Sequence, residues 1–169
     1  PSELVRRAVA FEVDLLALTD HDTIAGLAEA QQTIVDKDLA LRLLPGIEIS
    51  CSWEALEIHV VGLGIDPASQ SLLQLIGKQN QAREARALEL GRRLAKQQIP
   101  DAYEGAKALA GKGSLTRAHF ARYLVANGHC QNFQKAFDRY IGRGGKAYVP
   151  HDWVSIAQAI AVIHEAGGV

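Results

Sequence analysis

Three short segments of the chain place side chains that commonly bind metals within apolar surroundings. The turn 19–22 reads Thr-Asp-His-Asp and directly follows the apolar run 13–18. Glu48 interrupts the apolar segment 46–50, and His59 lies in the apolar segment 57–64. Imidazole nitrogens and carboxylate oxygens are the ligands that proteins use for Zn²⁺, Mn²⁺ and Fe²⁺. Taken together, the three segments favour a metal centre.

Each segment taken alone has a simpler interpretation. Asp22 and Thr23 both suit the N-cap of a helix. Glu48 could turn outward to solvent on an edge strand, since side chains alternate between the two faces of a strand. A lone histidine such as His59 usually belongs to an ordinary structural network. The co-occurrence of all three segments favours metal-dependent hydrolysis, because the sequence contains no nucleophile-elbow, Walker-loop or dinucleotide-binding glycine pattern.

The elements that must position these side chains alternate along the first 66 residues. Apolar spacing predicts a helix over 2–10, and the short apolar run 13–18 is typical of a buried strand. Thr23 is expected to cap a helix that runs to about residue 35. Further strands are expected over 39–44, 47–50 and 58–65, with a break at Pro45-Gly46. This order predicts βαβ units, a parallel sheet or barrel, and a site at the carboxyl ends of the strands.

The composition changes at residue 69, where a long polar helix rich in arginine is expected to run to residue 98. Thr116 is expected to cap a short helix, and another helix is expected over 132–141. Ser155 and Gln158 have the spacing of a capping box. We therefore predict that residues 1–68 form the first part of an α/β domain, that 69–147 form a helical insertion, and that 148–169 return to the first domain. The end of the sequence predicts a helix, a glycine stop and the start of a further strand.

Bulk properties exclude several classes of protein. The chain has 169 residues, 48% of them hydrophobic, and no run of about 20 apolar residues of the kind that spans a bilayer. A formal net charge of -1 predicts no global field toward nucleic acid or a membrane. Cys51 and Cys130 match no zinc or redox spacing and suit a reducing compartment. We therefore expect a soluble, cytoplasmic protein with no membrane partner and no obligate protein partner.

Two groups of residues in the predicted insertion are suited to binding a phosphate. Asn80, Arg83 and Arg86 fall near one face of the long helix. Arg117 and His119 lie in the first turn of the helix that follows Thr116, where backbone N–H groups and the helix dipole favour an anion. Arginine adds bidentate phosphate recognition. The alternative is a solvated helix face whose arginines pair with acidic neighbours on the same helix.

The segments LLALTDHDT, LLPGIEISC and EIHVVGLGID resemble signature segments of the polymerase and histidinol phosphatase (PHP) family of phosphoesterases. The resemblance implies an α/β fold of the distorted (β/α)7 TIM-like barrel type with an inserted helical subdomain. It also implies two or three divalent metal ions, with Mn²⁺ expected and Fe²⁺ or Zn²⁺ as alternatives. His21, Glu48 and His59 map to metal ligands, with Glu48 bridging ions. Asp20, His21 and Glu48 map to the catalytic set, with Asp20 supporting a ligand rather than binding metal directly.

Within the family, the chain is most similar to the branch that removes the 3'-phosphate of 3',5'-nucleoside bisphosphates and degrades short RNA from its 5' end. The resemblance therefore implies a nucleotide or short RNA as substrate. Alternatives are a histidinol-phosphatase-like or other PHP hydrolase, or a non-catalytic PHP module that binds nucleic acid. The family's His-x-His, Ala-His-Pro and Asp-x-His segments are absent from residues 1–169, and the sequence has no methionine. We therefore expect a fragment, whose activity belongs to the intact protein.

Overall fold

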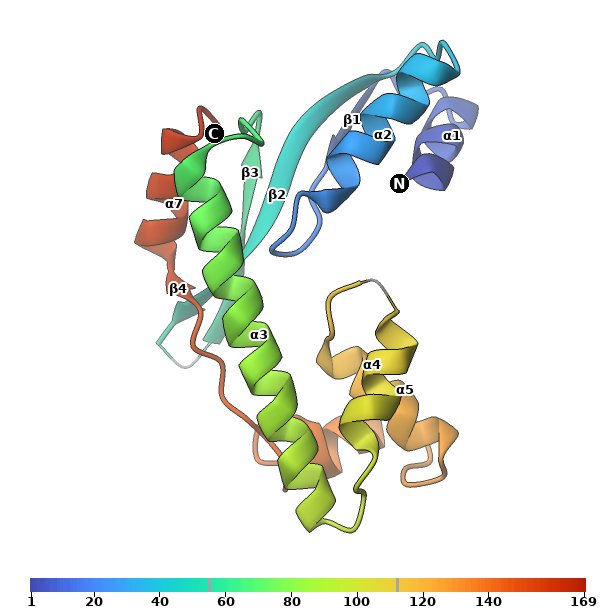
Figure 1. Cartoon of the computed structure of the whole chain (residues 1–169), viewed down its shortest axis with the longest axis vertical. Coiled ribbons are helices and arrows are strands. Elements are labelled where there is room, and N and C mark those ends of the chain that lie inside the picture. The colour runs from blue at the N-terminus through green and yellow to red at the C-terminus, as the bar shows by residue number, and fades with distance from the viewer. Residues whose placement is uncertain (55, 112) are drawn as a thin grey trace. The chain divides into compact units, whose positions relative to one another are not determined.

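The computed structural model describes residues 1–54, 56–111 and 113–169. The chain forms two compact units (Figure 1). Unit 1 comprises Pro1–Gln79 and Trp153–Val169, and unit 2 comprises Asn80–Asp152. The long helix α3 (Gln70–Lys96) begins in unit 1 and ends in unit 2. The compact units thus divide at Gln79 and Asp152, whereas the domain boundaries predicted from the sequence lie at residues 68 and 147.

Unit 1 has an α/β fold. Its elements, in chain order, are α1 (Ser2–Ala10), β1 (Leu15–Leu18), α2 (Ala25–Asp36), β2 (Arg42–Trp53), β3 (Leu56–Leu63), the start of α3, β4 (Val154–Ser155) and α7 (Ile156–Glu165). The helix predicted over 2–10 and the β–α–β order of the first segment are confirmed. The capping box of α7 is also confirmed, since the Ser155 N–H donates to the Gln158 side chain and the Gln158 N–H donates to the Ser155 hydroxyl.

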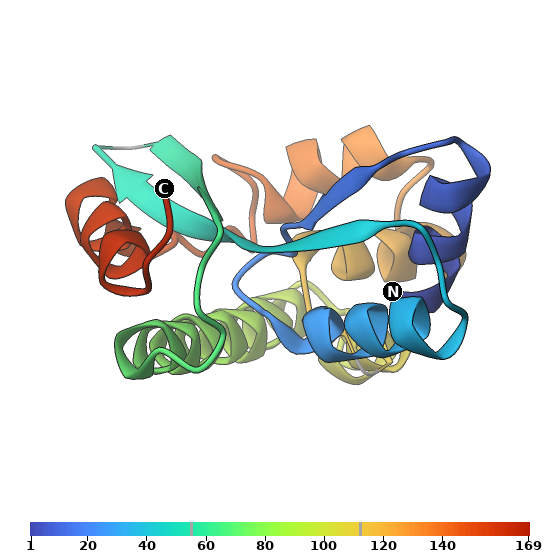
Figure 2. The same ribbon diagram turned by 90° about the horizontal axis from the view of Figure 1, so that it is seen from above.

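Strand β2 is the central strand of the sheet and changes partner halfway along its length (Figure 2). Its first residues pair in parallel with β1, ending with Leu18 opposite Pro45. From Gly46 onward it pairs antiparallel with β3. Beyond this, its residues Cys51 and Ser52 also pair in parallel with β4. Side chains from β1, β3 and the turns that follow them can therefore lie beside those of β2.

The predicted break at Pro45-Gly46 is wrong, because β2 continues through both residues. Pro45 lies at the point where β2 leaves β1, so its missing N–H removes little from the ladder, and its carbonyl accepts the N–H of Gly64 at 2.8 Å. Gly46 lies where neighbouring atoms leave no room for a side chain. A Cβ there would lie 2.8 Å from Cγ2 of Thr19 and 3.1 Å from the Leu18 carbonyl oxygen.

The expectation of a parallel sheet is confirmed for β1 with β2 and for β2 with β4, but not for β3. β2 ends at Trp53 and β3 begins at Leu56. A connection this short allows only an antiparallel hairpin, because a parallel crossover needs a dozen or more residues. The sheet is therefore mixed.

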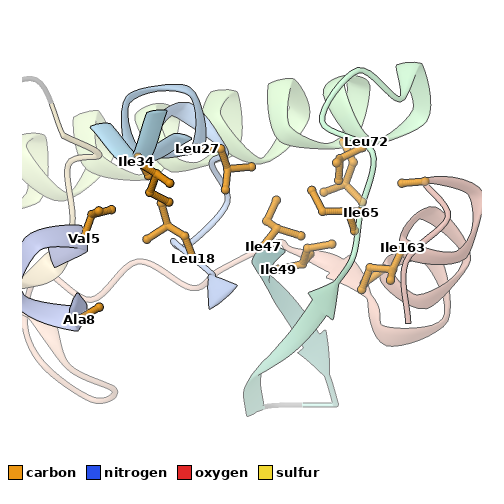
Figure 3. Close-up of a cluster of buried hydrophobic side chains, with 14 of the residues drawn as sticks. Val5, Ala8, Leu18, Leu27, Ile34, Ile47, Ile49, Ile65, Leu72 and Ile163 are labelled. Atoms are coloured by element: carbon orange, nitrogen blue, oxygen red, sulfur yellow. The ribbon is translucent and has the colours of Figure 1, made fainter. Parts of the chain in front are cut away.

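The core of unit 1 lies between the sheet and the helices of the same unit (Figure 3). Ile47 and Ile49 of β2 are fully buried, as are Val5 of α1 and Leu72 of α3. Ile163 of α7 packs in the same cluster. The alternation of Ile47, Glu48 and Ile49 along β2 directs the isoleucines into this core and turns Glu48 to the opposite face.

Unit 2 is helical in its described part. It contains the end of α3, α4 (Ala102–Ala110), α5 (Arg117–Ala126), α6 (Phe133–Ala136) and the π-helical turn η1 (Phe137–Ile141). The long helix from residue 69, the helix after Thr116 and the helix over 132–141 were predicted, whereas α4 was not. A separate core contains Leu94, Phe120, Leu124 and Ile141.

Among the described residues, no helix combines the length and the apolar composition needed to cross a lipid bilayer.

Candidate metal centre

The turn after β1 is held beside β2 by a continuation of the parallel ladder. The N–H of Glu48 donates to the carbonyl of Asp20 at 3.2 Å, and the N–H of Asp22 donates to the carbonyl of Glu48 at 2.9 Å. His21 and Glu48 are therefore directly paired in parallel. Side chains of paired residues project from the same face of a sheet, so the pairing places the imidazole beside the carboxylate.

His59 reaches the same carboxylate from β3. In the antiparallel ladder His59 lies opposite Ser50, and Glu48 lies opposite Val61. Residues two apart on a strand share a face, so His59 and Glu48 are diagonal neighbours, within reach of long side chains. The β2–β3 register therefore places His59 at the centre.

The three side chains form a compact cluster. Nδ1 of His21 lies 3.3 Å from Oε2 of Glu48, and Nδ1 of His59 lies 2.9 Å from Oε1. Nε2 of His21 lies 3.1 Å from Nδ1 of His59, and the two rings meet edge to face with centroids 4.6 Å apart. Each carboxylate oxygen thus faces a different imidazole.

This cluster fits a divalent metal ion by its donor set and its solvent access. His21, Glu48 and His59 each offer one ligand atom, and the three atoms lie within 4.8 Å of one another. Two imidazoles with one glutamate form a ligand set found in hydrolytic zinc enzymes, and Mn²⁺ and Fe²⁺ accept the same donor types. The side chains of His21 and His59 are 52% and 36% exposed, so a water molecule or substrate has access to the cluster.

The two aspartates of the turn have different surroundings. Asp22 is fully buried and adopts a left-handed backbone with φ of 51°. Its Oδ1 accepts the N–H of Ser50 at 2.9 Å and a side-chain N–H of Gln79 at 3.2 Å. The alternative interpretation of Asp22 as a helix N-cap is wrong, because the N-cap position of α2 is Ile24. Asp22 instead joins the turn to β2.

Asp20 is exposed and lies against the first turn of α2, since a Cβ on Gly26 would meet its Oδ2 at 3.0 Å. A carboxylate at this place is stabilised by the helix dipole. The supporting role implied for Asp20 by the resemblance stays a prediction.

Asn80 and Arg83 line a pocket of about 210 Å³ in unit 2, together with Glu84, Lys107 and Ser114. Lys107 adds a cation that sequence reasoning missed. Helical spacing could not place its ammonium group near Asn80 and Arg83, because Lys107 lies on α4, the helix that was not predicted. Lys107 donates to the Tyr103 hydroxyl at 3.2 Å.

Arg86 makes a contact within unit 2, since its Nε donates to the carbonyl of Val149 at 3.2 Å. Glu89, an acidic neighbour on the same helix, binds Arg92 and Arg93 at 2.6 and 2.7 Å. These two arginines lower the pKa of Glu89 to about 2 through hydrogen bonds and charge. The predicted contact between Arg86 and a phosphate stays a prediction.

Arg117 and His119 lie in the first turn of α5, which Thr116 caps. Nδ1 of His119 accepts the Thr116 N–H at 3.1 Å, and since an amide N–H only donates, the neutral ring carries its proton on Nε2. Burial lowers the pKa of His119, and the charge of Arg122 lowers it further. His119 is therefore a neutral N–H donor rather than a cation, and its predicted contact with substrate stays a prediction.

Sequence reasoning also missed Gln79, a buried amide on α3 that contacts Asp22 and Ser50. Its signal was present in the sequence. Leu72, Leu75 and Gln79 follow helical spacing on one face, and a glutamine in an apolar stripe indicates a buried polar contact.

The fold and the site together define an α/β protein with a cluster of two histidines and a glutamate, suited to binding a metal ion, beside the end of a parallel strand. The chain is homologous along its whole length to bacterial enzymes that cleave phosphate esters. It is 50% identical over 169 residues to a 5'-3' exoribonuclease of Haemophilus influenzae and 48% identical over 168 residues to the 5'-3' exoribonuclease Rnm of Escherichia coli. It is 37% identical over 169 residues to the 3',5'-nucleoside bisphosphate phosphatase of Chromobacterium violaceum. The resemblance noted from the three signature segments is confirmed.

The chain spans 57–61% of the length of these curated relatives, while at least 99% of its own residues are aligned. No protein-family model matches it.

Solved structures agree with this relationship. An amidohydrolase from Chromobacterium violaceum, solved with bound sulfate and without metal, superposes with a TM-score of 0.89 at 37% identity. A protein from Bifidobacterium adolescentis, described as a candidate metal-dependent phosphoesterase, superposes with a TM-score of 0.87 at 29% identity. Each match covers all of this chain and 59% of the solved one. The α/β fold class is therefore shared with these two solved structures.

Proposed function

We propose that this protein, in its full length, is a metal-dependent phosphoesterase that removes the 3'-phosphate of 3',5'-nucleoside bisphosphates and degrades short RNA from its 5' end. The observation that carries the proposal is the cluster of His21, Glu48 and His59, whose ligand atoms converge within 4.8 Å. The names of its relatives, exoribonuclease and nucleoside bisphosphate phosphatase, support the substrate class.

Divalent metal ions held by these side chains would supply a water-derived nucleophile at neutral pH and neutralise charge on the phosphate oxygens. We infer that Glu48 would be a ligand of this centre through its carboxylate, whose two oxygens face different imidazoles. His21 and His59 would each hold one side of the cluster. Mn²⁺ is the proposed metal, and Fe²⁺ and Zn²⁺ suit the same donors.

We infer that the substrate has one phosphate that reacts and one that does not, and that unit 2 binds the phosphate that does not react. Asn80, Arg83 and Lys107 line one pocket and offer several N–H donors. Arg117 adds a guanidinium at the first turn of α5, and His119 adds a neutral N–H donor. Charge-assisted hydrogen bonds of this kind are the strong ones in phosphate recognition.

We further propose that the mixed sheet of unit 1 is part of the distorted (β/α)7 barrel of PHP phosphoesterases. TM-scores of 0.89 and 0.87 over 59% of two solved chains support this proposal. A cytoplasmic location is consistent with two buried cysteines that form no disulfide.

The experiment is a phosphate-release and nucleotide-release assay on the full-length protein with added Mn²⁺. Adenosine 3',5'-bisphosphate, a short 5'-phosphorylated RNA and histidinol phosphate are compared as substrates. We expect turnover of the first two, and loss of that turnover with a chelator. Turnover of histidinol phosphate alone would favour a different PHP hydrolase, and turnover of none would refute the proposal.

The Glu48→Gln variant tests the site itself, with Glu3→Gln, an exposed glutamate of α1, as the matched control. Loss of an outer-sphere partner costs about 10–100-fold in metal affinity or activity, so loss of a direct ligand is expected to cost at least the upper end. The Glu3→Gln variant is expected to keep wild-type turnover.

A further inference from the structure

Gln79 is a buried carboxamide in an otherwise apolar helix face. It is 2% exposed and follows Leu72 and Leu75, both buried, on the inner face of α3. Burying an amide without hydrogen bonds costs free energy, whereas a leucine or methionine at this position would bury without that cost. Gln79 must therefore gain its place through specific polar contacts.

Those contacts join the two segments that hold the metal-ligating side chains. Nε2 of Gln79 donates to the carbonyl of Ser50 at 2.6 Å and to Oδ1 of Asp22 at 3.2 Å. The same Oδ1 accepts the N–H of Ser50 at 2.9 Å. The side chain of Gln79 thus closes a three-way network between α3, β2 and the turn after β1.

Each partner of Gln79 is adjacent to a ligand of the proposed centre. Asp22 follows His21 in the turn. Ser50 is two residues from Glu48 on β2 and lies directly opposite His59 in the ladder. A displacement of either partner would therefore change the spacing of the ligands.

The backbone of the turn needs such support. Asp22 has φ of 51°, in the left-handed region that non-glycine residues adopt only at a cost. Conformations of this kind persist where the surrounding structure determines them. The hydrogen bonds from Ser50 and Gln79 to the Asp22 carboxylate hold the Asp22 backbone in this conformation.

The hydrogen bonds of the network match the two donors of an amide nitrogen. A carboxamide nitrogen has two N–H groups, and Gln79 directs both at oxygen acceptors, the Ser50 carbonyl and the Asp22 carboxylate. Glutamate would place an oxygen against two oxygens, and methionine would offer no donor.

We propose that Gln79 is a positioning residue that sets the spacing between His21 and Glu48 and thereby the metal affinity of the centre. This inference rests on the proposed function, since it assumes that the cluster binds metal. The hydrogen bonds of Gln79 go to Asp22 and Ser50 and not to the metal-ligating side chains, so Gln79 acts through these two residues.

The test compares Mn²⁺ binding by isothermal titration calorimetry in the full-length wild type and in Gln79→Met. The matched control is Gln74→Met, the same substitution at an exposed position of the same helix. We expect Gln79→Met to bind Mn²⁺ up to about 10-fold more weakly, the lower end of the loss seen when a direct partner of a metal ligand is removed, because Gln79 acts through Asp22 and Ser50. Gln74→Met is expected to bind Mn²⁺ as the wild type does.

Thermal unfolding of each metal-free variant separates positioning from folding, because a residue with only a structural role would shift the melting temperature and leave the dissociation constant of the folded protein unchanged. If Gln79→Met does not fold, Gln79→Asn keeps the amide, shortens its reach by one methylene, and is expected to weaken Mn²⁺ binding in the folded protein. Wild-type affinity in the folded Gln79 variant overturns the inference. Absence of Mn²⁺ binding by the wild type instead overturns the proposed function.

Discussion

Nδ1 of His59 lies 2.9 Å from Oε1 of Glu48, although the two residues are diagonal rather than opposite in the β2–β3 ladder. The contact depends on the strand register, because a slip of one residue would turn His59 to the other face of the sheet. The same carboxylate contacts His21 through the parallel bridge to the turn after β1. The centre therefore joins a parallel and an antiparallel pairing on one strand.

Replacement of His59 by alanine is predicted to remove metal from the centre while the protein stays folded. The reason is that one of three converging donors is lost, whereas the side chain of His59 is 36% exposed and its removal takes little from the core. His164→Ala, at an exposed histidine of α7, is the matched control and should retain metal. The measurement is the metal content of the purified full-length variants by elemental analysis. Equal metal content in His59→Ala and wild type would refute the assignment of His59 as a ligand.

Gly46→Ala is predicted to destabilise the protein by about 1–3 kcal/mol, the usual cost of an added methyl group in a packed site. The new Cβ would lie 2.8 Å from Cγ2 of Thr19 and 3.1 Å from the carbonyl oxygen of Gly62. Gly77→Ala is the control, because a Cβ there meets nothing within 4 Å. This exposed helical position should gain about 0.5–1 kcal/mol. Urea unfolding measures both, and an unchanged midpoint in Gly46→Ala would contradict the close approach.

We predict that the free energy of unfolding of unit 2 depends on pH through the titration of His119. Burial and the charge of Arg122 lower its pKa below the ordinary 6.5, so the unfolded chain binds a proton more readily than the native protein. This contribution to stability is full above about pH 6.5 and is lost as the pH falls through the lowered native value. His119→Gln removes the titration but keeps a Thr-x-x-Gln capping box with Thr116.

The check is the free energy of unfolding at about pH 7 and about pH 5, the range over which histidine changes charge. The wild type is expected to lose more stability across this range than His119→Gln. An equal loss in both proteins would show that His119 does not contribute.

Cys51 is predicted to resist alkylation in the native protein. It is fully buried, and burial together with the negative charge of Asp22 raises its pKa to about 11. Because the thiolate is the reactive form, the native thiol should react very slowly at mildly alkaline pH. Labelling with iodoacetamide followed by mass spectrometry is expected to modify Cys51 only after denaturation. A Cys51→Ser variant assigns the modified residue, and rapid labelling of native Cys51 would contradict its burial.

Much of the local structure could be predicted from the sequence because its signals are local. The apolar spacing of residues 2–10, the capping residue Thr116 and the Ser155–Gln158 pair each act within a few residues, and the helices α1, α5 and α7 follow. Helix α4 was missed because the segment after residue 98 was characterised by its glycine, alanine and lysine content, although the apolar residues of α4 do follow an amphipathic pattern. Within unit 2, Gly105 of this helix allows close contact with the Tyr123 ring.

The break expected at Pro45-Gly46 shows the limit of turn signals. Proline and glycine usually end a strand, but here they lie where β2 exchanges β1 for β3 as its partner. The exchange is a property of the sheet and not of the local sequence.

The identities of His21, Glu48 and His59, their placement beside apolar strands and their suitability for a divalent metal were determined by the sequence alone. The tertiary structure decided that their atoms converge, because convergence depends on the register of β2 with β1 and β3. A period-two pattern specifies the face of a strand but not which residue of a distant strand lies opposite. It also decided that Asp22 is buried beneath the centre with Gln79, a contact between residues 57 apart in the chain. Such long-range contacts form only when packing brings separate elements together, which no local sequence pattern encodes.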